Sequence, residues 1–197
     1  MMLTVIIFGL LFCGGLAWFL EGIKQNSARW IALGSFIAFA LFFAFSITNG
    51  PQSFNELQLL TRIPWISAFN IEYALALDHL SITLIILTFF LAIICVLVSW
   101  QEIQEKCGFY YFNLLVSIAG IIGVFCAVDL FLFFFFWEVM LLPMTAIIAI
   151  WGHENRHFAA IKFFIFTQVS SLLMLVAIIA TAYFYQQQIG VLSFFYQ

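Results

Sequence analysis

The stretch that decides the fold is FYYFNLLVSIAGIIGVFCAVDLFLFFFFWEVMLLPMTAIIAIW, residues 109–151. It holds 43 residues, and about 20 apolar residues are enough to cross the hydrocarbon core of a bilayer. The stretch therefore predicts two membrane-spanning helices joined by one turn. Asp129 is the only charged residue in its first 29 positions, and aspartate is a favoured helix N-cap. We place the turn near 127–129, and Asp129 has a structural role there.

Four further apolar stretches flank this segment and are long enough to cross a bilayer. They cover residues 2–20, 29–48, 80–100 and 158–185. The fold class is therefore all-α, a polytopic membrane helix bundle of about six transmembrane helices. Residues 49–79 form one long loop, and 186–197 are too short to span and form a tail. The chain divides into three parts: 1–108 with the first three helices, 109–185 with helices four to six, and the tail 186–197.

The composition excludes whole classes of protein. Of 197 residues, 66% are hydrophobic and 8% are charged, with a net charge of −3, whereas soluble domains carry roughly 25% charged residues. A soluble domain, a disordered tail and a basic nucleic-acid binder are excluded. The four cysteines are far apart and make no CxxC pair, so they are interpreted as small apolar residues and not as a redox centre.

The distribution of basic residues predicts the orientation of the chain in the membrane. Five basic residues lie in or beside the loops on one side, and Arg62 lies alone on the other. The five are Lys24, Arg29, Lys106, Arg156 and Lys162. Because basic loops stay in the cytoplasm, we expect both termini, the loop 49–79 and the tail 186–197 to be external. The predicted location is the cell inner (cytoplasmic) membrane, and the lipid bilayer is an expected partner.

Glu138 is the strongest candidate for a functional residue. It lies nine residues after Asp129, which is about 13.5 Å along a helix and close to the middle of a bilayer core about 30 Å thick. Nothing near it in the sequence can pair with it. A carboxyl group at that depth can change between charged and neutral forms, as a proton relay requires. The alternative is a permanently protonated glutamic acid that is hydrogen-bonded between helices.

Two residues extend this candidate site. Pro143 has no N–H, so it frees the carbonyl of Val139 and favours a kink and a hydrated path beside Glu138. Lys162 lies about one turn inside the sixth helix. It either extends to the cytoplasmic interface or points inward as a second relay, followed along the helix by Thr167, Gln168, Ser170 and Ser171.

The remaining charged residues are interpreted as structural. Glu21, Lys24, Arg29, Glu102, Glu105 and Lys106 lie at helix ends or in loops, where solvated side chains are expected. His153 and His157 are four residues apart but flank a loop, and further ligands are lacking. We therefore expect no metal site in this chain.

Several motifs resemble one family. DLFLFFFFWEVMLLPM at 129–144, WGH at 151–153, AAIKFF at 159–164 and TQ at 167–168 closely resemble the subunit M (chain 4) family of proton-pumping NADH-quinone oxidoreductase, respiratory complex I. IPWI at 63–66 and LDHLS at 77–81 resemble the loop before the third helix of that family. The similarity covers essentially the whole chain.

The resemblance implies that Glu138 is the essential glutamate of the fifth helix in an antiporter-like proton channel. Its lysine partner belongs to a seventh helix, so the resemblance implies the N-terminal portion of a longer subunit. Residues 109–185 would then begin the proton-translocating module. NADH, FMN, iron–sulfur clusters and quinone are expected in partner subunits, with no cofactor in this chain. The expected partners are the other membrane subunits of complex I, especially the sister antiporter-like subunits.

Two alternatives share these features. The first is a subunit of a multi-subunit cation/proton antiporter or of a membrane-bound hydrogenase, which carry the same glutamate. The second is a truncated, non-pumping scaffold fragment that packs helices and moves no ions.

Overall fold

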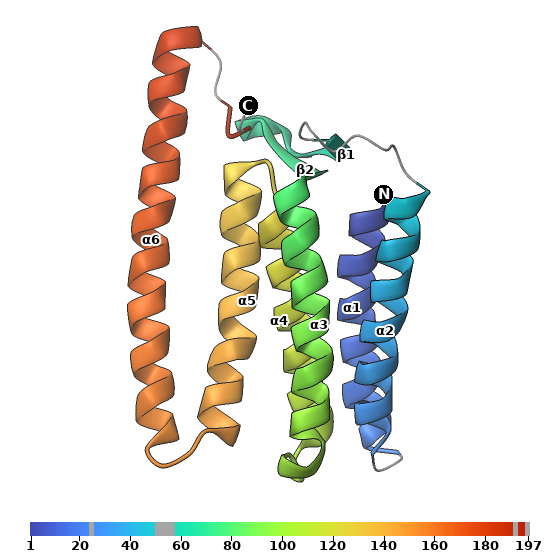
Figure 1. Ribbon diagram of the computed structural model, residues 1–197. Coiled ribbons are helices and arrows are strands. Elements are labelled where there is room, and N and C mark those ends of the chain that lie inside the picture. The colour runs from blue at the N-terminus through green and yellow to red at the C-terminus, as the bar shows by residue number, and fades with distance from the viewer. Residues whose placement is uncertain (24–25, 50–57, 191–192, 196–197) are drawn as a thin grey trace.

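Six helices long and apolar enough to span a membrane form the main body of the protein. The computed structural model describes residues 1–23, 26–49, 58–190 and 193–195 (Figure 1). The helices are α1 (Met2–Glu21), α2 (Ser27–Thr48), α3 (His79–Glu102), α4 (Cys107–Cys126), α5 (Leu130–Trp151) and α6 (Arg156–Ile189). The six predicted spans are confirmed, and the bounds differ from the predicted ones by at most a few residues.

The helices run side by side in one bundle (Figure 1). The links α1–α2, α3–α4 and α5–α6 lie at one end, and both termini lie toward the other end. In space α4 lies between α1 and α5, and α6 packs on α5 at the edge of the bundle. Six membrane crossings, an even number, would bring both termini to the same side, as this arrangement does. That the termini face the outside stays a prediction, and Lys24 lies outside the described residues.

Small residues allow α4 and α5 to approach closely. A Cβ atom added to Gly123 would lie 2.4 Å from the ring of Phe136, and one added to Gly120 would lie 3.1 Å from Cβ of Met140. Helices in lipid associate mainly through such close packing, because lipid tails are as apolar as the side chains. The close contact between α4 and α5 therefore depends on Gly120 and Gly123, where a side chain on α4 would collide with α5.

The long loop contains an antiparallel β-hairpin, which the sequence analysis did not predict. Strand β1 (Gln58–Ile66) pairs with β2 (Ile71–Leu77), and the short 3-10 helix η1 (Ser67–Phe69) connects them. Pro64 lies within β1, which tolerates a proline because both strands of a two-stranded sheet are edge strands. The described part of the loop is thus an ordered cap over one end of the helix bundle (Figure 1). Residues 50–57 of the predicted loop lie outside the described residues.

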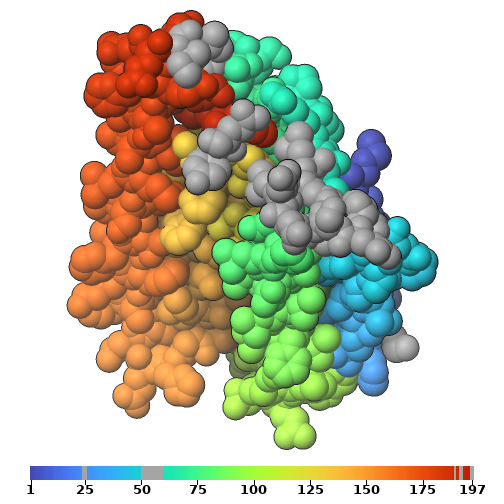
Figure 2. Space-filling view, turned by 45° about the horizontal axis from the view of Figure 1, so that its top comes forward, coloured from blue at the N-terminus to red at the C-terminus, as the bar shows by residue number. Residues whose placement is uncertain are grey.

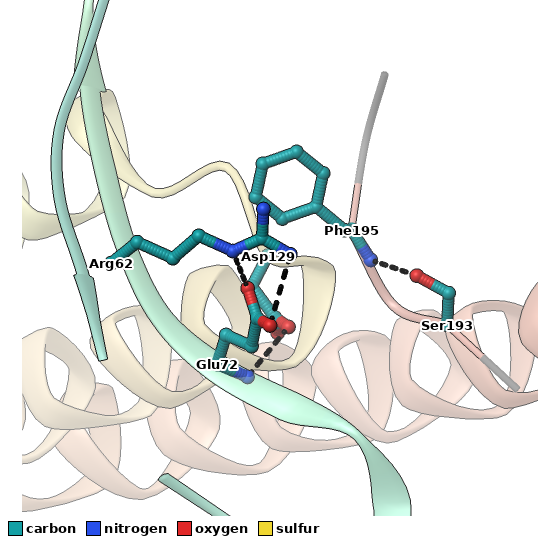
Figure 3. Close-up of polar contacts among 5 residues, drawn as sticks. All are labelled: Arg62, Glu72, Asp129, Ser193 and Phe195. Carbon is teal, nitrogen blue, oxygen red and sulfur yellow. Dashed lines mark hydrogen bonds and ion pairs between the residues drawn. The ribbon is translucent and has the colours of Figure 1, made fainter. Parts of the chain in front are cut away.

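Asp129 joins the hairpin to the helix bundle. Its side chain is fully buried and accepts hydrogen bonds from the backbone N–H groups of Phe131 and Leu132 at 2.9 and 3.0 Å. The predicted N-cap and the predicted turn are therefore confirmed. The other carboxylate oxygen of Asp129 accepts the backbone N–H of Glu72 in β2 at 3.1 Å (Figure 3). One buried carboxylate thus caps α5 and holds β2.

The end of the described chain returns to the same place. Gly190, with φ of 82°, ends α6 in the left-handed conformation that glycine favours. Beyond it, the carbonyl of Phe194 accepts the backbone N–H of Leu130 at 2.9 Å. On the other side, Val128 donates to the carbonyl of Ala74 at 3.1 Å. We call β2, residues 127–129 and residues 193–195 the hairpin junction.

The surface of the hairpin junction carries an ion pair. Arg62 of β1 binds the carboxylate of Glu72, and its guanidinium lies 4.9 Å from the centre of the Phe195 ring (Figure 3). The backbone N–H of Phe195 is bonded to Oγ of Ser193 at 3.2 Å. The tail, which the sequence analysis treated only as external, is in this part bound to the hairpin and to α5.

The interpretation of Arg29 as a solvated charge is wrong. Its side chain is 6% exposed. Nη2 donates to the carbonyl of Ile103 at 2.8 Å and lies 3.3 Å from Oε1 of Gln104. A buried arginine must find acceptors, and here the α3–α4 link supplies them. Arg29 therefore connects α2 to that link at the predicted cytoplasmic end.

Candidate functional site

Glu138 lies in the middle of the bundle and contacts α6. It is the ninth of the 22 residues of α5, and its side chain is half-buried. Ser171 of α6 is 1% exposed and donates its hydroxyl hydrogen to Oε1 of Glu138 at 2.5 Å. Among the described residues no cation lies within ion-pair distance of Glu138. The site is therefore a carboxyl group with one neutral hydrogen-bond partner.

The α5–α6 seam, which we define as the face of α6 that packs on α5, carries both apolar and polar side chains. Its buried members are Ala160, Ser171, Ile178 and Ala182, and Thr167 and Gln168 are half-buried. On α5, Thr145 lies two turns from Glu138 and bonds to the carbonyl of Leu141 at 2.9 Å. Polar groups thus lie on both helices between Glu138 and the predicted cytoplasmic end.

Large apolar side chains dominate the remaining, exposed surface of α6, which also carries Lys162, Ser170 and Thr181. Figure 1 shows α6 at the edge of the bundle, and Figure 2 shows it forming one flank of the molecule. Large apolar side chains along it are more than half exposed, among them Phe166, Leu173 and Val176. In a membrane these large apolar side chains meet lipid or another helix, because exposing them to water would be unfavourable.

Lys162 lies apart from Glu138. Its side chain is exposed, and its ammonium group lies 4.5 Å from the centre of the Phe158 ring, one turn toward the start of α6. This position is the one expected of a lysine that extends toward the membrane interface. A relay function for Lys162 stays a prediction, and the structure does not bring it together with Glu138.

Pro143 is buried, and α5 continues through it as one helix. An apolar cavity of about 460 Å³ lies on another side of α5, lined by residues that include Val139, Phe136 and Gly120. Glu138 is not part of its wall. The hydrated path predicted beside Pro143 stays a prediction.

The predicted cytoplasmic end of the seam is polar. His153 and His157 are exposed, and the indole N–H of Trp151 donates to the carbonyl of Glu105 at 2.9 Å. Arg156 donates to the carbonyl of Ile150 at 2.6 Å. In the described ranges, no three His, Cys, Asp or Glu side chains are grouped so that they could hold a metal ion.

The two aspartates at helix starts have opposite electrostatic environments. Burial raises the pKa of Asp129, and the backbone N–H groups of Leu132, Glu72 and Phe131 oppose that rise. Asp78, the N-cap of α3, accepts hydrogen bonds from Ser81, and these lower its pKa. Desolvation destabilises the charged form, and hydrogen-bond donors stabilise it. Three backbone hydrogen bonds thus hold the Asp129 carboxylate in a buried position, where desolvation makes its negative charge unfavourable.

The sequence analysis did not predict that Ser171 pairs with Glu138. A signal for this pair exists in the spacing. Glu138 lies 13 residues before the last residue of α5, and Ser171 lies 15 residues after the first residue of α6. In two antiparallel helices joined by a short link, residues at similar distances from the link lie at the same height. The sequence analysis noted Ser171 only as one of several polar residues.

Comparisons with known proteins show which membrane subunits this chain is similar to. A sequence model described as NADH:quinone oxidoreductase/Mrp antiporter, TM, matches residues 127–196. The NADH-quinone oxidoreductase subunit M of Pseudomonas aeruginosa is 43% identical over 199 residues, which cover 94% of this chain. Over nearly its whole length the chain is thus similar to these membrane subunits. It spans 39% of the length of the Pseudomonas relative, and the same share of subunit M from Escherichia coli, which is also 43% identical.

Solved structures show the same fold. Respiratory complex I from Thermus thermophilus matches 99% of the chain with a TM-score of 0.79 and 20% identity, over 38% of the matched chain. The Mrp complex from Dietzia matches 98% of the chain with a TM-score of 0.80 and 19% identity, over 20% of the matched chain. Proteins in two kinds of complex thus share the helix bundle in which Glu138 lies near the middle of α5.

Proposed function

We propose that this chain is part of the membrane arm of a proton-translocating NADH-quinone oxidoreductase, in the cell inner membrane. Within it, Glu138 takes up and releases protons near the middle of the bilayer. The observation that supports this most directly is a half-buried carboxyl group near the middle of α5 with one neutral partner among the described residues, in a chain 43% identical to subunit M of two bacteria. An ionisable residue at such a depth is costly and is retained where it has a function.

The open surroundings of Glu138 suit this function. Ser171 occupies Oε1, and no described residue is bonded to Oε2. A cation from a helix packed on the exposed flank of α6 or on the adjoining face of α5 would favour the charged form of Glu138, and its departure would favour the neutral form. Coulomb coupling between charges in a low-dielectric interior is strong enough to drive such a change.

The chain would perform no redox chemistry itself. NADH oxidation and quinone reduction, with FMN and iron–sulfur clusters, are assigned to partner subunits. Other membrane subunits, especially the sister antiporter-like subunits, are the proposed partners of the exposed apolar surfaces. Lys162 and the polar residues of the α5–α6 seam would then lie on the cytoplasmic side of Glu138, where protons enter.

A second candidate is a subunit of an Mrp-type cation/proton antiporter. The fold match to the Mrp complex from Dietzia, with a TM-score of 0.80, is as close as the match to complex I. The two candidates differ in what drives proton movement. Proton uptake that depends on NADH favours the oxidoreductase, and uptake that depends on a sodium gradient without NADH favours the antiporter.

Replacing Glu138 by glutamine tests the proposal. Glutamine keeps the shape and an acceptor for Ser171 but cannot change charge, so the complex should assemble normally. NADH-driven proton pumping in membrane vesicles should fall by about tenfold or more, because positioned acid–base groups contribute on the order of 10²–10⁴-fold. The matched control is Glu154→Gln, in the exposed link between α5 and α6. Normal pumping by a fully assembled Glu138→Gln complex would exclude the proposed role.

A further inference from the structure

The hydroxyl of Ser171 has two acceptors within reach. Its Oγ lies 2.5 Å from Oε1 of Glu138 and 3.1 Å from the backbone carbonyl of Gln168. A serine hydroxyl carries one hydrogen and can also accept hydrogen bonds. In a helix such a hydroxyl commonly bonds to a carbonyl of the preceding turn. The same hydrogen therefore has two alternative positions, which are selected by rotation about the Cβ–Oγ bond.

We propose that Ser171 is a positioning residue that serves both charge states of Glu138 by reversing the direction of its hydrogen bond. When Glu138 is ionised, the serine hydrogen points to Oε1. When Glu138 gains a proton, its new O–H donates to Oγ of Ser171, and the serine hydrogen turns to the carbonyl of Gln168. Glu138 gains one proton, and no covalent bond of Ser171 breaks. This inference rests on the proposed function and deepens it.

The burial of Ser171 makes this exchange significant. At 1% exposure the hydroxyl cannot rely on bulk water, so each state needs a protein partner. The acceptor in one state is Oε1, and in the other it is a carbonyl that α6 supplies from its own backbone. A neutral, reversible partner keeps both states of Glu138 bonded. A fixed cation, in contrast, would hold the carboxyl group in its charged form.

The other described titratable groups on the elements packed against α5 lie away from Glu138. Those described on the elements packed against α5 lie toward the helix ends or in the hairpin, and no hydrogen bond or ion pair links one to Glu138. They are Arg156, His157, Lys162, Tyr183 and Tyr185 on α6, Cys107, Tyr110, Tyr111 and Cys126 on α4, and Glu72 and Tyr73 on β2. At the height of Glu138, α4 presents Gly120 and Gly123 to α5.

Ser171→Ala in the assembled membrane complex tests the inference. Two readouts are needed: the pH profile of NADH-driven proton pumping, and the infrared carboxyl C=O band that disappears in Glu138→Gln. Removing the hydroxyl takes a donor from the ionised form, so the midpoint of the pH profile should move upward by about one pH unit. The C=O band should also move to higher frequency, because the protonated carboxyl loses its acceptor.

Two variants serve as controls. Ser170→Ala changes the adjacent residue, which is exposed and bonds to the carbonyl of Phe166, and should leave both readouts as in the unaltered complex. Ser171→Thr keeps the hydroxyl and should restore both. A purely structural role would lower the amount of assembled complex and would not move the band. If Ser171→Ala behaves like Ser170→Ala in both readouts, the inference is wrong.

The failures of the two proposals can be told apart. If Glu138→Gln pumps normally, the proposed function of Glu138 is wrong, and the frequency of the carboxyl band in Ser171→Ala still decides whether the serine bonds to it. If Glu138→Gln abolishes pumping while Ser171→Ala changes neither readout, Glu138 acts without this serine.

Discussion

Helix α5 has two neighbours in the sequence, α4 and α6, and contacts them in different ways. Its contact with α4 is close and lies below the hairpin junction, where Asp129 has three backbone hydrogen bonds and full burial. Among the described residues, its contact with α6 includes one hydrogen bond between two side chains, from Ser171 to Glu138, and one at the helix ends from the Arg156 side chain to the carbonyl of Ile150. Both regions contain a carboxyl group on the same helix, nine residues apart.

The difference separates a structural carboxylate from an adjustable one. Asp129 is surrounded by donors that belong to the backbone and cannot turn away. Glu138 has one donor that can rotate, and its second oxygen has no bond among the described residues. A fully satisfied network specifies one structure, whereas a partly satisfied one leaves room for another partner or state. Backbone hydrogen bonds thus fix the start of α5, whereas the side chain of Glu138 at its middle can change partners.

The largest expected effect on stability comes from Asp129→Ala. It removes the N-cap of α5, which is worth about 0.5–2 kcal/mol. It also leaves the buried N–H of Glu72 without an acceptor, at a cost of about 1–3 kcal/mol. We expect the chain to lose about 2–4 kcal/mol of stability, measured by thermal unfolding of the purified protein in detergent. Asp129→Asn keeps one acceptor oxygen and should recover part of the loss. Equal stability of Asp129→Ala and the unaltered chain would contradict the role of the hairpin junction.

A smaller effect is expected from Gly123→Ala, which tests the close contact between α4 and α5. The new methyl group would lie 2.4 Å from the Phe136 ring, so the ring or the helix must move, at a cost of about 1–3 kcal/mol. Gly15→Ala is the control, because a Cβ there meets nothing within 4 Å. The thermal midpoints of the two variants should differ clearly. If both are unchanged, the closeness of α4 and α5 is not what stabilises them.

The smallest expected effect concerns pH and compares Asp129 with Asp78. The pKa of Asp78 is lowered in the folded chain, so its charge contributes stability at neutral pH that is lost as the pH falls through this lowered pKa. The pKa of Asp129 is raised, so acidification relieves an unfavourable charge. Relative to Asp78→Asn and Asp129→Asn, the stability advantage of the unaltered chain should shrink on acidification for Asp78 and grow for Asp129. Thermal midpoints between pH 7 and about 3 decide this, and parallel changes for both would contradict it.

The parts of the fold that depend on local sequence could be predicted. Spans of about 20 apolar residues must cross the bilayer as helices, since their backbone groups find no water there. Asp129 was recognisable as a cap because it interrupts a long apolar stretch. The position of Glu138 near the middle of α5 follows from counting residues along a helix whose N-cap is Asp129.

The parts that depend on contacts between distant segments could not be predicted from one sequence. Strand β1 contains Pro64, and its pairing with β2 is a contact between two segments that neither segment specifies alone. Arg29 resembled a solvated charge because its acceptors come from a link more than 70 residues away. The bond between Ser171 and Glu138 required knowing how α6 is rotated against α5.

The return of residues 193–195 to the start of α5 also bears on how α6 can move. The short link before Arg156 holds one end of this long helix, and the bond between Leu130 and Phe194 holds the segment that follows its other end. A helix fixed at both ends cannot easily shift along its axis or tilt away from the bundle, but it can bend or rotate at its middle. Ser171 lies near the middle of α6, between the two fixed ends, so a small deflection there would change the distance to Glu138 while both ends stay in place.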